Sequence, residues 1–395
     1  MSKLSRFFTI KGDRAIWYMV ILLMLMSLLV IYSSTGRLAY NEQGGNTFFY
    51  LVKQLFFVFS GLVILLIFQR VEYTNYLRYA SVLLGISFCL LLYARFAGAH
   101  FNGAGRWIRI PLIGFTFQPS EFAKISVVIY MARQIAFAQE ERWCNARVVK
   151  DCWPVAFLLV VIFWDNFSTF ALVLAVCILM LFVGRVQWRT LFKLVGSLIF
   201  LSALFLGIIM LVPEKYLKGV GRVETVKGRI VDFVSGSDDV KGYSFQSTHA
   251  RIAIANGGLI GKGPGNSVQR NFLPHPYSDF IYAIVIEEYG LLFGGGGIIL
   301  IYLIILYRVG VIVRRSTRVF PAMLVLGLGF TILLQAMIHM GVCVGLLPVT
   351  GQTLPVVSMG GTSLFFTCVS FGIILSVSRS FSKEEAGGEE AGGGE

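Results

Sequence analysis

Long apolar runs recur along the whole chain and are separated by short polar segments. Many of the runs have about eighteen residues or more, which is enough to cross a bilayer core of about 30 Å as a helix. The pattern predicts an all-α, multi-pass membrane protein. We expect about ten transmembrane helices, at about residues 15–34, 50–68, 76–96, 119–137, 153–165, 167–184, 190–212, 279–306, 319–345 and 359–378.

The same pattern predicts how the chain is divided. Residues 1–13 would be a basic N-terminal tail, and residues 14–380 one membrane domain. Within this domain, the long polar segment 213–278 predicts a large extracytoplasmic loop between spans seven and eight. Residues 381–395 are acidic and rich in glycine, a composition typical of disorder.

Composition and charge support this interpretation and suggest an orientation. The chain is 56% hydrophobic and only 14% charged, with a formal net charge of +13. Lys and Arg concentrate in the tail and in short loops that would lie on one side, which predicts that both termini are cytoplasmic. Nucleic-acid binding is a poor explanation, because the basic residues are scattered over many loops. They are Lys3, Arg6, Lys11, Arg14, Arg70, Arg78, Arg133, Arg142, Arg147, Lys150, Arg185, Arg189, Arg308, Arg314, Arg315, Arg318, Arg379 and Lys383.

The long outer segment 213–278 is also basic, with nine Lys or Arg residues. A loop of this length is exempt from the charge rule for orientation. A basic outer surface indicates an anionic partner, and contact with lipid headgroups explains it equally well.

An ionisable side chain at bilayer depth is costly and is therefore a functional candidate. The first such stretch is NFLPHPYSDFIYAIVIEEYG, from Asn271 to Gly290. We expect Ser278 to cap the helix and Asp279 to lie in its first turn, ionised, at the outer membrane boundary. Spacing alone favours an ordinary first-turn residue. Glu287 and Glu288 lie deeper and point away from Asp279, so we expect them to pair with basic groups inside the bundle.

Two further stretches combine helix signals with polar groups. In RWIRIPLIGFTFQPSEFAKI, Pro119 begins a helix, and Glu121 and Lys124 are spaced to pair on one face. Spacing alone favours a neutralised pair, and an interfacial anchor for Arg106. The uncharged segment 345–364 is rich in Pro and Gly. Because lipid cannot satisfy irregular backbone, this segment predicts a re-entrant loop shaping a site, in preference to a tight outer turn.

Phosphate-loop and metal-binding patterns are not evident. The segment NGGLIGKGPG has Asn256 where a P-loop begins with Gly, and Gly263 where Ser or Thr must follow the lysine. A flexible external loop whose backbone can approach an anion is the better interpretation. The four histidines lack metal-ligand spacing. No cofactor is therefore evident; a divalent metal ion stays possible, although no ligand cluster is identified.

Four segments, taken together and in order, resemble the SEDS family, which includes FtsW and RodA. They are QPSEFAK, GGLIGKG, LPHPYSDFIYAIVIEEYG and GLLPVTGQTLPVVSMGGTS. The resemblance covers about residues 14–380 and is closer to FtsW, the division member. It implies a peptidoglycan glycosyltransferase that polymerises lipid II outside the cytoplasmic membrane. The implied partners are a class B penicillin-binding protein, which is a transpeptidase, and other divisome proteins.

The resemblance also assigns residues. Asp279 matches the family's catalytic aspartate. Family motif positions near the same cavity are occupied by Arg106, Gln118, Ser120, Glu121 and Lys124. Further candidates for substrate binding are the cations Arg251, Lys262 and Arg270 and, in the last motif, Ser358, Gly360 and Gly361. Three positions depart from the family pattern: His275 stands where an acid is frequent, Asn166 where Asp is common, and Met359 where an aromatic residue is usual.

The expected chemistry is transfer of a sugar from a lipid pyrophosphate to a sugar hydroxyl. A carboxylate that accepts the hydroxyl proton contributes about 100- to 10,000-fold, and preorganised cations stabilise the leaving pyrophosphate. Two other classes stay open: a flippase or transporter that moves lipid II, and a non-catalytic scaffold that recruits a transpeptidase. A flippase needs charge along a path across the membrane, whereas the motif residues here crowd the outer edge.

Overall fold

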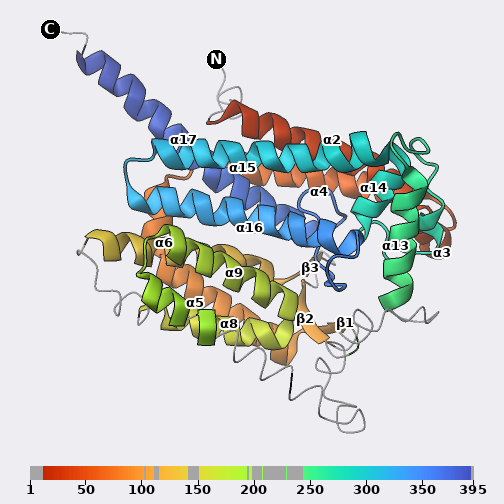
Figure 1. Ribbon diagram of the computed structural model, residues 1–395, viewed down its shortest axis with the longest axis horizontal. Helices are drawn as coiled ribbons and strands as arrows, with labels where there is room; N and C mark the ends of the chain where they lie inside the picture. Colours follow the sequence, from red (N-terminus) through yellow and green to blue (C-terminus); the bar gives the residue numbers. More distant parts are fainter. Residues whose placement is uncertain are drawn as a thin grey trace. The chain divides into compact units, whose positions relative to one another are not determined.

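The computed structural model describes residues 12–101, 104–110, 115–140, 151–193, 195–197, 207, 228 and 243–392. Within these ranges, side chains at 41–43, 99–106, 109, 110, 115, 140, 243, 244 and 382–392 are not described. The described chain is mostly helical, with one small sheet (Figure 1).

The chain is divided into two compact units. The first consists of Met1–Arg78, Gln246–Leu346 and Gly351–Glu395, and the second of Tyr79–Phe245 and Leu347–Thr350. The first unit therefore holds Asp279, whereas the pair of Glu121 and Lys124 belongs to the second.

The first unit is a bundle of long apolar helices with a cross-lying helix at one end. Helices α2, α4, α15, α16 and α17 contact one another in the pairs α2–α4, α2–α15, α15–α16, α15–α17, α16–α17 and α4–α17. Helix α13 runs across the end of α15 and α16, beside α14 (Figure 1). The elements are α2 (Arg14–Ser34), α3 (Gly36–Gln43), α4 (Thr47–Phe68), the start of α5 (Tyr73–Ala97), α13 (Tyr243–Gly257), the 3₁₀-helix η1 (Gln269–Asn271), α14 (Ile281–Tyr289), the π-helix η2 (Gly290–Gly296), α15 (Gly297–Arg315), α16 (Val319–Cys343) and α17 (Gly361–Gly392).

One carboxylate links the start of α2 to α15. The Asp13 side chain accepts hydrogen bonds from the backbone amides of Ala15 and Ile16, and so caps α2. The same carboxylate accepts a hydrogen bond from Arg308 Nε at 2.9 Å. The cap and the ion pair together fix the register of these two helices at this end.

The second unit combines helices with a short antiparallel sheet. The strands β1 (Ala99–Phe101), β2 (Ala104–Ile110) and β3 (Phe115–Phe117) lie in that order. Ile108 is opposite Phe117, and Ile110 opposite Phe115. The helices are the rest of α5, α6 (Pro119–Glu140), α8 (Trp153–Asp165) and α9 (Phe167–Val183). Strand β2 contacts α6 and α8, and β3 ends two residues before α6 begins, so the sheet leads directly into the start of α6.

Most described helices coincide with the predicted apolar runs. Six are long and apolar enough to cross a membrane, over Arg14–Ser34, Thr47–Phe68, Tyr73–Ala97, Ile281–Arg315, Val319–Cys343 and Gly361–Phe381. Helices α8 and α9 are shorter apolar helices. Most of the seventh run, 190–212, and most of the loop 213–242 lie outside the described residues. Ten spans and the position of the long loop therefore stay predictions.

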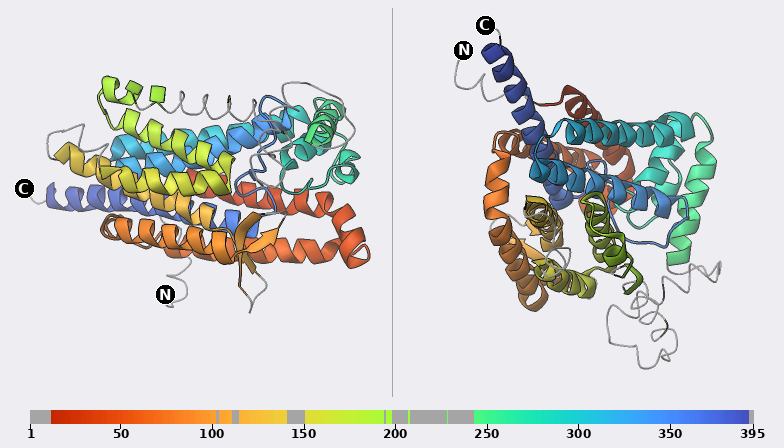
Figure 2. Two further views of the ribbon diagram at one scale, coloured as in Figure 1. Left: turned by 90° about the horizontal axis from the view of Figure 1, so that it is seen from below. Right: turned by 60° about the vertical axis from the view of Figure 1, so that its left-hand side comes forward.

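Three details differ from the expectations. Residues 99–101, 104–110 and 115–117 form the sheet, in a stretch between the third and fourth predicted spans where only an outer loop was expected. The end of the expected outer loop contains the helix α13. Helix α17 continues to Gly392, through most of the segment expected to be disordered, and projects past the other helices of its unit (Figure 1, Figure 2). Glycine and net charge predicted disorder there, but the same segment also holds five Glu and two Ala, which favour helix.

Candidate active site

Asp279 lies in a half-buried turn immediately before α14. Its backbone amide donates to the His275 carbonyl at 3.2 Å, and Ser278 Oγ donates to Asp279 Oδ1 at 2.9 Å. The expected helix cap is wrong: α14 has Phe280 at its N-cap, with no side-chain cap hydrogen bond. The Ser278 hydroxyl bonds to the neighbouring carboxylate, and Asp279 is left before the helix, in the turn.

The non-helical segment after α16 packs against this turn. Met359 N donates to the Tyr277 carbonyl at 2.9 Å. Ser358 Oγ donates to the Ser278 carbonyl at 2.8 Å, and accepts from Leu354 N at 2.8 Å. Ser358, a candidate from the sequence, is therefore hydrogen-bonded to the residue that precedes Asp279.

Glycines in this segment lie close to the aspartate and to the start of α17. A methyl group built on Gly351 would lie 3.8 Å from Asp279 Oδ2. Gly360 lies beside Thr353 and Ser363, and Gly361 is the first residue of α17. The side of Asp279 Oδ2 that faces residue 351 is therefore not covered by a side chain from that position.

The backbone of this segment is strained at Val356. Its φ is 67°, a left-handed value that is a genuine outlier for a β-branched residue. The flanking carbonyls are bonded: Tyr302 Oη donates to the Pro355 carbonyl at 2.6 Å and Ser27 Oγ to the Val357 carbonyl at 2.9 Å. Strain of this kind persists where the surroundings hold it, and it clusters at functional sites.

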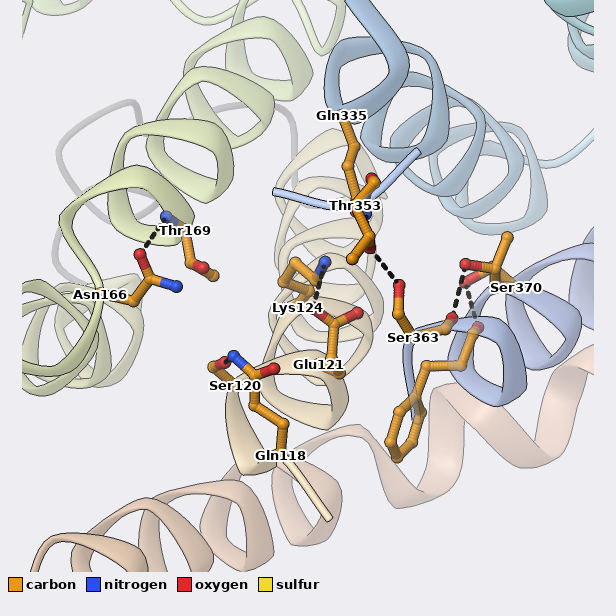
Figure 3. Close-up of polar contacts among 12 residues, drawn as sticks. Gln118, Ser120, Glu121, Lys124, Asn166, Thr169, Gln335, Thr353, Ser363 and Ser370 are labelled. Carbon is orange, nitrogen blue, oxygen red and sulfur yellow. Dashed lines mark hydrogen bonds and ion pairs between the residues drawn. The ribbon is translucent and has the colours of Figure 1, made fainter. Parts of the chain in front are cut away.

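Polar side chains on one face of α16, which were not among the candidates from the sequence, hold the same segment. Gln335 Nε2 donates to the Thr353 carbonyl at 2.9 Å, and Thr353 Oγ1 lies 2.9 Å from Ser363 Oγ (Figure 3). His339 Nδ1 lies 2.8 Å from the Gln352 carbonyl. The available signal was the spacing of four between Gln335 and His339 in an otherwise apolar run, which places both on one helix face.

Glu287 organises the loop that follows α13. Its carboxylate accepts from Lys262 Nζ at 3.1 Å, from Ser267 Oγ at 2.5 Å, and from the backbone amides of Val268 and Gln269, both at 3.2 Å. The candidate cation Lys262 is thus engaged with an acid of α14.

The other two candidate cations of this unit also contact the protein. Arg270 donates to the Ser33 carbonyl at 2.8 Å and to its hydroxyl at 2.9 Å. The Ser33 hydroxyl in turn donates to Glu288 Oε1. The Arg251 guanidinium lies over Gly345, where a methyl group would be 2.5 Å from its Nε. Arg251 therefore packs at the end of α16, where the non-helical segment begins.

The second unit holds the remaining candidates. Glu121 Oε1 and Lys124 Nζ form a buried ion pair at 2.9 Å (Figure 3). Gln118 Nε2 donates to Ser120 Oγ at 3.0 Å. Arg106 lies in β2, and its side chain is outside the described ones. Asn166 caps α9 by accepting from Thr169 N at 3.5 Å (Figure 3).

His275 is exposed, with Nδ1 3.4 Å from Tyr277 Oη. Among the described residues, no group of three or more His, Cys, Asp or Glu could hold a metal ion.

A family model described as "Cell cycle protein", for FtsW, RodA and SpoVE, matches residues 13–383. The chain belongs to this family, SEDS. This confirms the resemblance inferred from the four sequence segments, and the match extends over the whole predicted membrane domain, residues 14–380.

Curated members of the SEDS family are similar along most of their length. The probable peptidoglycan glycosyltransferase FtsW of Neisseria gonorrhoeae is 31% identical over 93% of this chain and 84% of its own. Stage V sporulation protein E of Bacillus subtilis is 30% identical over 93% of this chain and 97% of its own. FtsW of Geobacter metallireducens is 32% identical over 93% and 94%, respectively.

Solved structures share the fold. A chain from a structure described as "Structural coordination of polymerization and crosslinking by a peptidoglycan synthase complex" has a TM-score of 0.70 at 23% identity, covering 94% of this chain and 98% of that one. The crystal structure of the rod shape determining protein RodA of Thermus thermophilus has a TM-score of 0.65 at 22% identity, covering 93% and 97%. This SEDS chain therefore has a RodA-like helical fold.

Proposed function

We propose that this SEDS protein is a peptidoglycan glycosyltransferase that polymerises lipid II at the outer face of the cytoplasmic membrane. The observation that carries the proposal is the placement of Asp279, a carboxylate in a half-buried turn at the end of an apolar bundle, against a strained segment. The naming of FtsW relatives as probable peptidoglycan glycosyltransferases supports the reaction class. The family description, "Cell cycle protein", and the similarity to proteins named FtsW support a role in cell division.

Asp279 acts as the general base in this proposal. The hydrogen bond from Ser278 to Oδ1 holds the carboxylate in one orientation, and Oδ2 faces Gly351. A sugar hydroxyl that reaches within about 3 Å of Oδ2 would transfer its proton as it attacks the lipid-linked sugar, a contribution of about 100- to 10,000-fold.

The leaving pyrophosphate needs positive charge. Lys262 contacts Glu287 and Arg270 contacts Ser33, so of the three candidate cations in the first unit we assign this task to Arg251. The family resemblance assigns substrate contacts in the second unit to Arg106, Gln118, Ser120, Glu121 and Lys124. A divalent metal ion would neutralise the same charge, and measuring lipid II polymerisation with Mg²⁺ and with a chelator tests whether one is needed.

We also propose the partner proteins and the orientation of the chain in the membrane. A structural neighbour from a complex described as coordinating polymerization and crosslinking supports a class B penicillin-binding protein as partner, with other divisome proteins. The distribution of Lys and Arg supports cytoplasmic termini and an extracytoplasmic site.

The test is polymerisation of labelled lipid II by purified protein with its candidate transpeptidase, whose own activity is blocked. Wild type is compared with Asp279→Asn and with Glu72→Gln, an exposed carboxylate at the start of α5 that serves as the matched control. Glycan strands from wild type and Glu72→Gln, and none from a folded Asp279→Asn, are expected.

Two outcomes would contradict the proposal. Equal strands from Asp279→Asn would remove this residue as the base. No strands from wild type, with transpeptidase binding intact, would favour a lipid II flippase or a scaffold instead.

A further inference from the structure

Helix α16 carries a buried histidine whose hydrogen-bonding state is set by its partners. His339 is 1% exposed, and its Nδ1 lies 2.8 Å from the Gln352 carbonyl. A carbonyl oxygen only accepts, so Nδ1 carries the hydrogen. In the neutral ring, Nε2 is then left as an acceptor.

One helical turn further on, a buried thiol lies between this ring and the aspartate. Cys343 Sγ is 3.7 Å from His339 Nε2 and 3.9 Å from the Asp279 carbonyl oxygen. The ring is thus connected to both sides of the candidate site. It holds Gln352, which adjoins Gly351 beside Asp279 Oδ2, and it contacts the thiol that meets the Asp279 backbone.

We propose that His339 is a positioning residue for Asp279, acting through its hydrogen bond to the Gln352 carbonyl. The inference rests on the proposed function and adds a residue to it. An ionisable side chain inside a membrane-spanning helix is costly and is therefore a functional candidate. The ring contacts both the Gln352 carbonyl and the Cys343 thiol, which an apolar side chain could not do through hydrogen bonds. It thereby holds residues 351–353 in place beside the Asp279 carboxylate.

The geometry of the ring permits matched substitutions. In His339→Asn, the side-chain amide hangs from the same atom as Nδ1 and can donate to Gln352, but it does not reach Cys343. In His339→Gln, the amide reaches the position of Nε2 and not that of Nδ1. His339→Phe keeps the ring volume and removes both polar atoms. Thr331→Val, on the same helix, removes a buried hydroxyl that bonds only within its own helix, to the Gly327 carbonyl at 2.7 Å, and is the control.

The first measurement is steady-state polymerisation of lipid II. Loss of one buried hydrogen bond that orients the base predicts a fall in kcat of about ten- to a hundredfold for His339→Phe and His339→Gln. KM should stay within about threefold, because the substrate contacts are not removed. His339→Asn and Thr331→Val should stay close to wild type. A merely structural histidine would change expression and thermal stability without this split between kcat and KM, or this rescue by Asn.

The second measurement does not depend on activity. Hydrogen exchange followed by mass spectrometry reports the backbone amides of residues 350–360 and, separately, those of α16. His339→Phe should speed exchange in 350–360 while α16 stays protected, and His339→Asn should not. Unchanged exchange in 350–360 for His339→Phe would overturn the inference, as would an Asn variant as impaired as the Phe variant. If wild type makes no glycan strands and the exchange pattern is as expected, the proposed function fails while the positioning contact stands.

Discussion

The Lys262 ammonium group lies 3.1 Å from the Glu287 carboxylate. Glu287 is fully buried, and it also accepts from one hydroxyl and two backbone amides of the loop that follows α13. A single acid of α14 therefore holds this loop on the bundle that carries Asp279. The contact assigns Lys262 a structural partner, although the sequence also made it a candidate for substrate binding.

Replacing Glu287 should lower the free energy of unfolding much more than replacing Lys262. Glu287→Gln keeps the size of the side chain but weakens several hydrogen bonds to a buried charge, so we expect a loss of unfolding free energy of about 2–4 kcal/mol. Lys262→Gln should lose at most about 1 kcal/mol, because the lysine side chain is one-third exposed. Denaturant unfolding in detergent measures both. An equal loss for the two variants would show that the ion pair, and not the set of loop donors, holds the loop.

Two glycines of the same loop should differ in their tolerance of a methyl group. Gly261 has φ +91°, and a methyl there would lie 2.3 Å from the Glu288 carbonyl oxygen and 2.4 Å from Gly290 N. Gly258 has φ +53° with open space around it. Gly261→Ala should undock the loop and expose Lys262 and Arg270 to trypsin. Gly258→Ala should cost only about 1–2 kcal/mol of left-handed strain and leave the cleavage pattern unchanged. Equal cleavage of the two variants would contradict the close approach.

The buried pair of Glu121 and Lys124 is suited to a double-mutant cycle. Each of Glu121→Gln and Lys124→Met alone should destabilise the protein by about 3–5 kcal/mol, because each leaves its partner buried. The double variant should recover a large part of this loss. Thermal unfolding gives the cycle, and lipid II polymerisation is measured on the same samples. A double variant that regains stability without activity would give the pair a role in the reaction, whereas recovery of both would make it purely structural.

Some features of the candidate site follow from local sequence. Helix α6 begins at Pro119, as its Pro-Ser-Glu start predicts, because proline at the first turn is a local preference. The start of α14 was misplaced. The same local rules made Ser278 the cap, but the helix has its N-cap two residues later, at Phe280, and the Ser278 hydroxyl donates to the Asp279 carboxylate.

Other features depend on pairing between distant residues. The strands at 99–117 have three to seven residues each, too short for a reliable alternation, and their register exists only once they pair. The glycines at 257–265 indicated a backbone that could approach an anion. In the fold, Gly261 packs against the backbone at the end of α14.

The sequence by itself determined the helical bundle, the membrane class and the family. Long apolar runs have few alternatives in a bilayer, where each helix satisfies its own backbone, and the four family segments are short and contiguous. Only the tertiary structure decided which polar groups serve which task. Glu288 contacts Ser33 across 255 residues, and Lys262 meets Glu287 across 25. Hydrogen bonds act over about 3 Å, so these partners are chosen by packing and cannot be read from spacing along the chain.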